Sequence, residues 1–154
     1  MKLKNRFPVL LLPVFLLVCG VQAFAEINIP AQPENYVVDL ADIIRPDAEA
    51  SLNGYLKHFE QISTVQMVIL TIQSLEGGSL EDFFFFLSHD RWKLGQKDKD
   101  NGVLLLVSLE DRKVRFEVGY GIEGVLTDAY SRRIIDQYIV PYFRQGDYTN
   151  GIVS

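Results

Sequence analysis

The stretch from residue 100 to residue 124, DNGVLLLVSLEDRKVRFEVGYGIEG, decides the fold of this chain. It begins with a nearly continuous apolar run from Val103 to Leu109, which is typical of a strand buried on both faces. A tight turn at residues 110–112 follows, and residues 113–118 then alternate between polar and apolar side chains, as in a half-exposed strand. The sequence therefore predicts an antiparallel hairpin that ends in a glycine-rich loop.

This hairpin determines which polar residues meet. Because its two strands run in opposite directions, the residues before Val103 and those after Val118 must lie at the same end of the sheet. The turn at Asp111 must lie at the other end. We therefore expect one end of the sheet to gather a set of oxygen-bearing side chains, namely Asp98, Asp100, Asn101, Glu123 and Asp128.

The rest of the chain supplies a β-α-β pattern before the hairpin. Residues 65–72 (VQMVILTI) form another buried run, and residues 36–38 are either a short strand or a buried anchor. The order of these elements predicts a mixed sheet with helices on its faces. Helices are expected from Pro46 to about Ile62, from an N-cap at Ser79 to about Leu94, and from Thr127 or Asp128 to about Ile139 with an interruption near Pro141.

The N-terminus has the three parts of a secretory signal peptide. An apolar run from Phe7 to about Val21 is followed by a small-residue cleavage site at residues 23–25. The run spans about 15 residues, whereas a membrane span needs roughly 20. We expect residues 1–25 to be removed with the only cysteine, Cys19, and the protein to be exported to the periplasm or the cell exterior. The positive charges before the run are Lys2, Lys4 and Arg6.

The charge of the chain after cleavage limits the classes of partner that it can bind. The remaining 129 residues carry 12 basic and 20 acidic side chains, a net charge of −8. Such a surface disfavours nucleic acids and anionic membranes, and it suits divalent cations or basic partners. Residues 26–35, with two prolines, are expected to form an extended leader, and residues 36–154 a single domain.

The glycine-rich loop at residues 119–124 (GYGIEG) matches the pattern of a dinucleotide-binding loop, but its context does not. The strand before it comes from a hairpin, and no strand with a terminal carboxylate follows at the expected distance. We therefore expect no nucleotide cofactor. The glycines instead shape the loops at this end of the sheet, where they are Gly102, Gly119, Gly121 and Gly124.

The acidic loop at residues 98–102 (DKDNG) resembles the front of a calcium-binding loop without completing one. Its alternative role is a turn whose side chains bond to their own backbone. The expected meeting of this loop with Glu123 and Asp128 favours a cation, because neighbouring carboxylates repel one another unless a positive charge intervenes. Oxygen ligands of this kind suit calcium, magnesium or manganese.

Several segments closely resemble the TPM domain family. They are YVVDLAD at residues 36–42, DNGVLLLV at 100–107, DRKVRFEVGYGIEG at 111–124 and PYFRQGDY at 141–148. The resemblance implies an α/β/α sandwich with a mixed sheet of about four strands. It also implies export or membrane attachment, since family members include thylakoid-lumen proteins described as acid phosphatases and bacterial envelope proteins that bind divalent cations.

The resemblance also suggests site residues. The family's acidic cluster falls on Asp100, Glu123 and Asp128 of this sequence, with Asp39 and Asp111 as further candidates. Calcium is the foremost ion, with magnesium and manganese as alternatives. The predicted topology, apart from the resemblance, makes Arg132 or Arg133 on the following helix the anion-binding candidate, with Arg132 foremost, because Arg112 belongs to the other end of the sheet. Related bacterial proteins continue beyond the domain, so its last helix is expected to be truncated here.

Two functions follow from these expectations. The first is a metal-dependent phosphatase-like hydrolase of the cell envelope. The second is a non-catalytic, metal-stabilised interaction module that assists the maintenance or assembly of a membrane protein complex. A third, purely structural role would need no ion. The sequence shows no G-x-S-x-G, H-E-x-x-H or P-loop motif and so identifies no catalytic residue.

Overall fold

The structure is a computed structural model that describes residues 27–154, apart from the side chains of residues 88–90. The predicted signal peptide lies outside the described residues. A four-stranded sheet forms the centre, in the spatial order β1-β2-β3-β4. The first three strands are parallel, and β4 is antiparallel to β3, as the hairpin predicts. The strands are β1 (Val37–Asp39), β2 (Gln66–Ile72), β3 (Gly102–Ser108) and β4 (Lys113–Val118).

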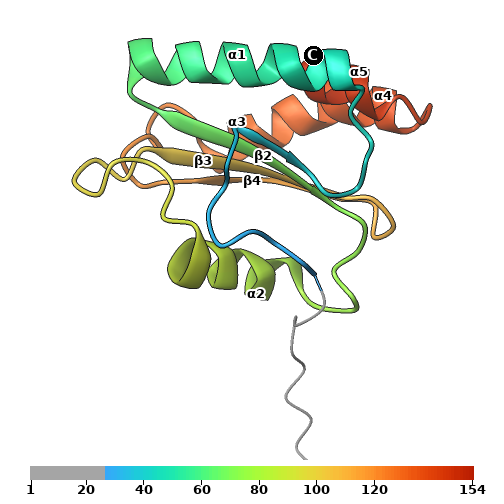
Figure 1. Ribbon diagram of the computed structural model, residues 1–154, viewed down its shortest axis with the longest axis horizontal. Coiled ribbons are helices and arrows are strands. Elements are labelled where there is room, and N and C mark those ends of the chain that lie inside the picture. The colour runs from blue at the N-terminus through green and yellow to red at the C-terminus, as the bar shows by residue number, and fades with distance from the viewer. Residues whose placement is uncertain (1–26) are drawn as a thin grey trace, which may run out of the picture.

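Helices cover both faces of this sheet (Figure 1). One face carries α2 (Leu80–Phe85). The opposite face carries α1 (Pro46–Ser63), α3 (Asp128–Ile134), α4 (Val140–Phe143) and α5 (Tyr148–Val153). The molecule is therefore an α/β/α sandwich with a mixed four-stranded sheet, and the expected fold class is confirmed.

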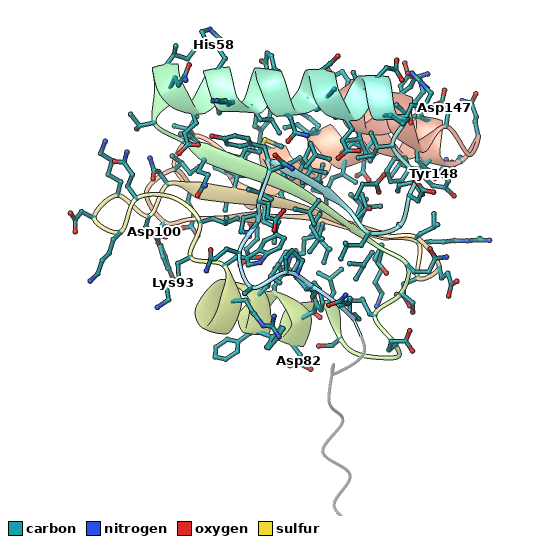
Figure 2. All side chains as sticks on the ribbon, in the orientation of Figure 1. His58, Asp82, Lys93, Asp100, Asp147 and Tyr148 are labelled. Atoms are coloured by element: carbon teal, nitrogen blue, oxygen red, sulfur yellow. The ribbon has the colours of Figure 1, made fainter. Side chains whose placement is uncertain are left out.

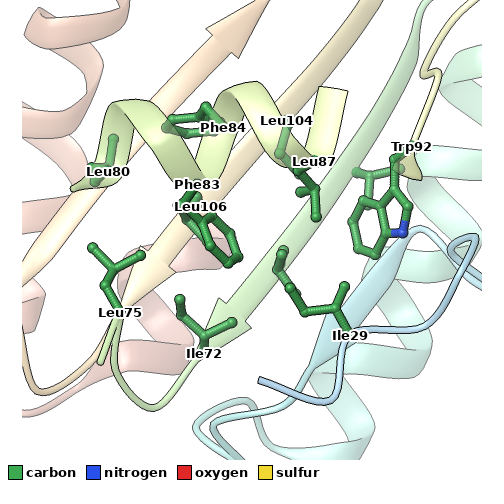
Figure 3. Packing of buried hydrophobic residues seen from close by; sticks show 12 residues of the cluster. Ile29, Ile72, Leu75, Leu80, Phe83, Phe84, Leu87, Trp92, Leu104 and Leu106 are labelled. Atoms are coloured by element: carbon green, nitrogen blue, oxygen red, sulfur yellow. The ribbon is translucent and has the colours of Figure 1, made fainter. Parts of the chain in front are cut away.

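Each face of the sheet has its own hydrophobic core. Successive side chains of a strand point to opposite faces, so Leu70 packs towards α2 while its neighbour Ile69 packs towards α1. This alternation explains why β2 and β3 are apolar almost throughout. Figure 3 shows the α2-side core, in which the ring of Phe83 lies beside Leu106 and the indole of Trp92 lies at the other end of the cluster, near Ile29.

The helix after Ser79 begins where the sequence predicts and ends slightly earlier. The Ser79 hydroxyl accepts a hydrogen bond from the Asp82 N–H at 3.0 Å and so caps α2. The helix continues as a π-helical turn over Phe86–Arg91 instead of reaching Leu94. Four consecutive phenylalanines cannot share one helix face, and Phe85 is accordingly 62% exposed.

The helical segment that contains Pro141 is continuous, which differs from the expected interruption. A π-helical turn over Ile135–Ile139 joins α3 to α4, so Pro141 falls in the first turn of α4. The proline has no N–H to donate, and it follows directly on a change of register, because the Val140 N–H donates to the carbonyl of Ile135, five residues back. The wider π turn changes the hydrogen-bond register just before the proline.

Residues 27–35 contain no helix or strand and pack against the α2 side. The Trp92 indole donates to the carbonyl of Pro30 at 2.9 Å, and the Arg91 guanidinium donates to the carbonyl of Ile29 at 3.1 Å. Ile29 itself is buried in the α2-side core. Among the described residues, no helix has the length and apolar character needed to cross a membrane.

Candidate functional site

The hairpin places Asp100 beside the glycine-rich loop. Val103 pairs with Val118 in the sheet, and the Gly119 N–H donates to the carbonyl of Gly102 at 2.8 Å. Beyond this pair, Asp100 Oδ2 accepts a hydrogen bond from the Tyr120 N–H at 3.1 Å. The two loops therefore form one surface at the amino end of β3.

Close backbone approach at this end depends on glycine. A Cβ on Gly119 would lie 2.2 Å from the carbonyl oxygen of Asp100, and one on Gly121 would lie 1.7 Å from that of Lys99. A Cβ on Gly102 would lie 2.5 Å from the carbonyl oxygen of Leu94. Gly124 differs, because no atom lies within 4 Å of the position its Cβ would take.

A cleft of about 790 Å³ opens on the α2 side of this surface. Its apolar wall includes Phe84, Leu87 and Trp92. Figure 2 shows Lys93 and Asp100 at the same end of the sheet. The cleft therefore combines negative and positive groups, and the charged residues that line it are Lys93, Lys97, Asp100, Glu117 and Glu123.

Glu117 on β4 is the member of this site that sequence reasoning missed. Burial raises the pKa of its carboxyl above the ordinary value, and the nearby Asp128 and Glu123 carboxylates raise it further. The Arg115 guanidinium, 3.6 Å away, opposes these effects on the pKa. The sequence could have indicated Glu117, because it lies two residues after Arg115 in β4, and side chains two residues apart in a strand share one face of the sheet.

The structure divides the predicted site residues between two hollows. Asp100 and Glu123 line the cleft, whereas Asp128 and Arg132 line a separate groove of about 620 Å³ along β4, together with Arg112. Asp128 is the first residue of α3, which is capped by the Thr127 hydroxyl. Among the side chains that the structure describes, which leave out those of residues 88–90, no three from His, Cys, Asp or Glu are grouped closely enough to hold a metal ion.

Asp39 and Asp111 lie at the opposite end of the sheet from Asp100, where β1 and β3 end. Asp39 accepts hydrogen bonds from the Ile44 N–H at 2.8 Å and from the Thr71 hydroxyl. These contacts hold the loop that leads into α1.

Asp111 closes the turn of the hairpin in a similar way. It accepts from the Ser108 hydroxyl at 2.6 Å and from the Leu75 N–H at 2.7 Å. The hydrogen bond from the Ser108 hydroxyl is the main cause of a lowered pKa of the Asp111 carboxyl, and the bond from the Leu75 N–H lowers this pKa further. Both Asp39 and Asp111 therefore use their oxygens to fix local backbone.

The chemistry of the cleft is that of oxygen ligands next to lysines. Carboxylate oxygens suit hard cations such as calcium, magnesium or manganese, and the ammonium groups of Lys93 and Lys97 suit an anion. Among the described side chains that line the cleft, none is a serine, threonine, cysteine or histidine. The described part of the cleft can therefore bind and orient charged groups, and it offers no hydroxyl or thiol nucleophile except the phenol of Tyr120.

Comparisons with known proteins agree on one family. The TPM domain family model matches residues 37–154. The solution structure of the N-terminal domain of a protein from P. gingivalis is 36% identical, with a TM-score of 0.70 over 77% of this chain and 74% of that one. The N-terminal domain of a Corynebacterium glutamicum protein is 13% identical, with a TM-score of 0.57 over 80% of this chain and 76% of that one, and shares the fold. No curated protein matches this chain.

Proposed function

The chain belongs to the TPM domain family, and from this membership and the chemistry of the cleft we propose that it is an exported domain that binds a divalent cation and has phosphatase-like activity at the cell envelope. The observation that carries this proposal is the cleft itself, because it brings carboxylates and lysines together within the part of the chain that matches the family.

The cation would be held by Asp100, Glu123 and Asp128, with calcium as the foremost ion. All three side chains are exposed, so Glu123 and Asp128 could turn towards an ion beside Asp100, whose Oδ2 accepts the Tyr120 N–H. Burial is the main cause of the raised pKa of Glu117, but repulsion from the Asp128 and Glu123 carboxylates raises it further, so negative charge gathers at this end of the sheet. A divalent cation at this end of the sheet would relieve that repulsion.

The phosphate of a substrate would lie in the cleft against Lys93 and Lys97. These lysines are better placed for this role than Arg132, which lines the other groove. A bound divalent cation would polarise a phosphoryl oxygen of the substrate. The apolar wall with Trp92 would limit the access of water to the bound group.

The second candidate is a non-catalytic, cation-stabilised module that assists a membrane protein complex. It is favoured by the exposed apolar side chains next to the candidate cation site, since Tyr120 and Val125 are each 82% exposed. An ion that fixes the loop at residues 119–124 would also fix these side chains for a partner. The absence of a serine, threonine, cysteine or histidine among the described cleft side chains points the same way.

Thermal unfolding with and without millimolar calcium, magnesium or manganese tests both candidates. An ion at about 100 times its dissociation constant should stabilise the folded state by roughly 2.7 kcal/mol. Asp100→Asn should reduce this shift, and Asp98→Asn, an exposed neighbour in the same loop, should leave it unchanged. No shift with any of the three ions would remove the cation from both candidates.

Turnover of a phosphomonoester in the presence of the stabilising ion separates the two candidates. The phosphatase proposal expects turnover that Lys93→Gln and Lys97→Gln reduce and that Lys57→Gln on α1 does not. A cation-stabilised protein without turnover would be the interaction module. Export is tested separately by sequencing the N-terminus of the mature protein, which should begin at Glu26.

A further inference from the structure

The groove along β4, which we call the β4 groove, lies between the two helical layers. Its lining comes from β4 itself, from Glu81 of α2 on one face of the sheet, and from Ser131, Arg132 and Ile135 on the other face. β4 is the last strand of the sheet and pairs with β3 alone among the described residues. The groove therefore follows an open strand edge.

The backbone of this edge has donors and acceptors that the sheet does not use. Gly119 and Gly102 form a hydrogen-bonded pair, and in an antiparallel ladder such pairs recur at every second residue. The backbone groups of Lys113, Arg115 and Glu117 therefore face β3. The N–H and C=O groups of Val114, Phe116 and Val118 point away from β3, into the groove.

The side chains of the groove are also only partly paired. The hydroxyl of Ser131 is 5% exposed and has no hydrogen-bond partner among the described residues. Arg115 pairs with Glu81 at 3.2 Å, whereas Arg112, Lys113 and Arg132 form no ion pair with another described residue. Two further carboxylates, Asp128 and Asp136, line the groove, so its lining holds four basic and three acidic side chains. The buried hydroxyl without a described partner favours a ligand that brings a hydrogen-bonding group, and the small excess of basic side chains favours one that carries negative charge.

We propose that the β4 groove binds an extended acidic peptide that adds to the sheet as a fifth strand. An extended backbone is the ligand whose donors and acceptors alternate at the spacing of a strand edge. Its side chains on the α2 side would lie beside Lys113 and Arg115 and would be acidic. Those on the α3 side would lie beside Val114 and Phe116, near Ile135, and would be apolar.

A fluorescent seven-residue peptide of alternating glutamate and valine tests this proposal by its backbone. The peptide has two alternating sets of residues, the glutamates and the valines, and only one set directs its N–H groups to β4. N-methylation of that set should weaken binding more than about tenfold. N-methylation of the other set, in a peptide of the same composition, should leave binding unchanged. The valine set is the sensitive one if the peptide runs antiparallel to β4.

The protein offers matched variants and a direct structural readout. Lys113→Gln should weaken binding about two- to fivefold, and Lys57→Gln on α1 should not change it. The amide protons of Val114 and Phe116 should become protected from hydrogen exchange when the peptide binds.

Three results would overturn the proposal. They are equal binding of the two methylated peptides, unchanged exchange at the β4 edge with peptide present, and a dimer in sedimentation whose β4 amides are protected without peptide. The last result would assign the groove to a second copy of this chain. None of these results depends on the cleft, and a chelator in the binding assay separates them from a cation at Asp128, which also lines the groove.

Discussion

Asp100 Oδ2 and the backbone N–H of Tyr120 lie 3.1 Å apart in a hydrogen bond that joins two loops 20 residues apart in the sequence. The carbonyl of Asp100 also accepts from the Gly121 N–H at 2.9 Å. The φ of Asp100 is 45°, in the left-handed region. The candidate cation site is therefore built on backbone that is already held in place.

Gly121→Ala should destabilise the protein, because its Cβ would lie 1.7 Å from the carbonyl oxygen of Lys99. Backbone would have to move, and overpacking of this kind costs about 1–3 kcal/mol. Gly124→Ala is the control, since no atom lies within 4 Å of its Cβ position, and it should change stability by less than about 0.5 kcal/mol. Urea unfolding of both variants measures the difference. Equal stabilities would contradict the close approach of the two loops.

Two buried hydroxyls should respond oppositely to removal. Thr149 Oγ1 accepts from the Arg45 N–H at 3.0 Å and donates to the carbonyl of Ile43 at 3.1 Å. Thr149→Val leaves both backbone groups without their partner and should cost about 1–3 kcal/mol. Ser131→Ala removes a hydroxyl that has no described partner, so the free energy of unfolding should stay the same or rise. Thermal or urea unfolding compares them, and a large loss in Ser131→Ala would reveal a partner for its hydroxyl.

Asp111 should contribute stability that is lost in acid. The pKa of its carboxyl is lowered in the folded state from an ordinary value of 3.8, so this stabilisation is fully present above pH 3.8 and disappears as the pH falls through the lowered pKa. Asp111→Asn should be less stable than the parent at neutral pH, and the gap should narrow below pH 3.8. Unfolding measured across this pH range checks the prediction. Asp98→Asn, at an exposed carboxyl, is the matched control for the substitution itself.

Glu117 should show the opposite dependence on pH. The pKa of its carboxyl is raised in the folded state from an ordinary value of 4.5, so the protonated form favours folding below pH 4.5 and this contribution is lost as the pH rises through the raised pKa. Carbon-13 NMR titration of the Glu117 carboxyl measures its pKa directly. Asp128→Asn and Glu123→Gln should each lower that pKa, because each removes a neighbouring negative charge. Glu34→Gln, far along the chain in an exposed position, should leave it unchanged.

The sequence by itself determined the sheet and the meeting of Asp100 with the glycine-rich loop. The apolar runs of β2 and β3 and the alternation of β4 are local patterns, and strand geometry converts them into a register. Because an antiparallel hairpin leaves no freedom in which ends meet, the neighbours of Tyr120 could be inferred without coordinates. The N-cap at Ser79 was equally local.

Only the tertiary structure decided how the charged residues are used. Burial and the field of neighbouring charges depend on the packing of α2 and α3 around β4, so the raised pKa of Glu117 has no local signature. Packing also separated Arg132 from Asp100, since a helix residue takes the direction that the docking of its helix imposes. The hydrogen bond from the Trp92 indole to the carbonyl of Pro30 joins segments 62 residues apart, and it also depends on that packing. Such long-range contacts arise from the shape of the assembled core, which no short stretch of sequence contains.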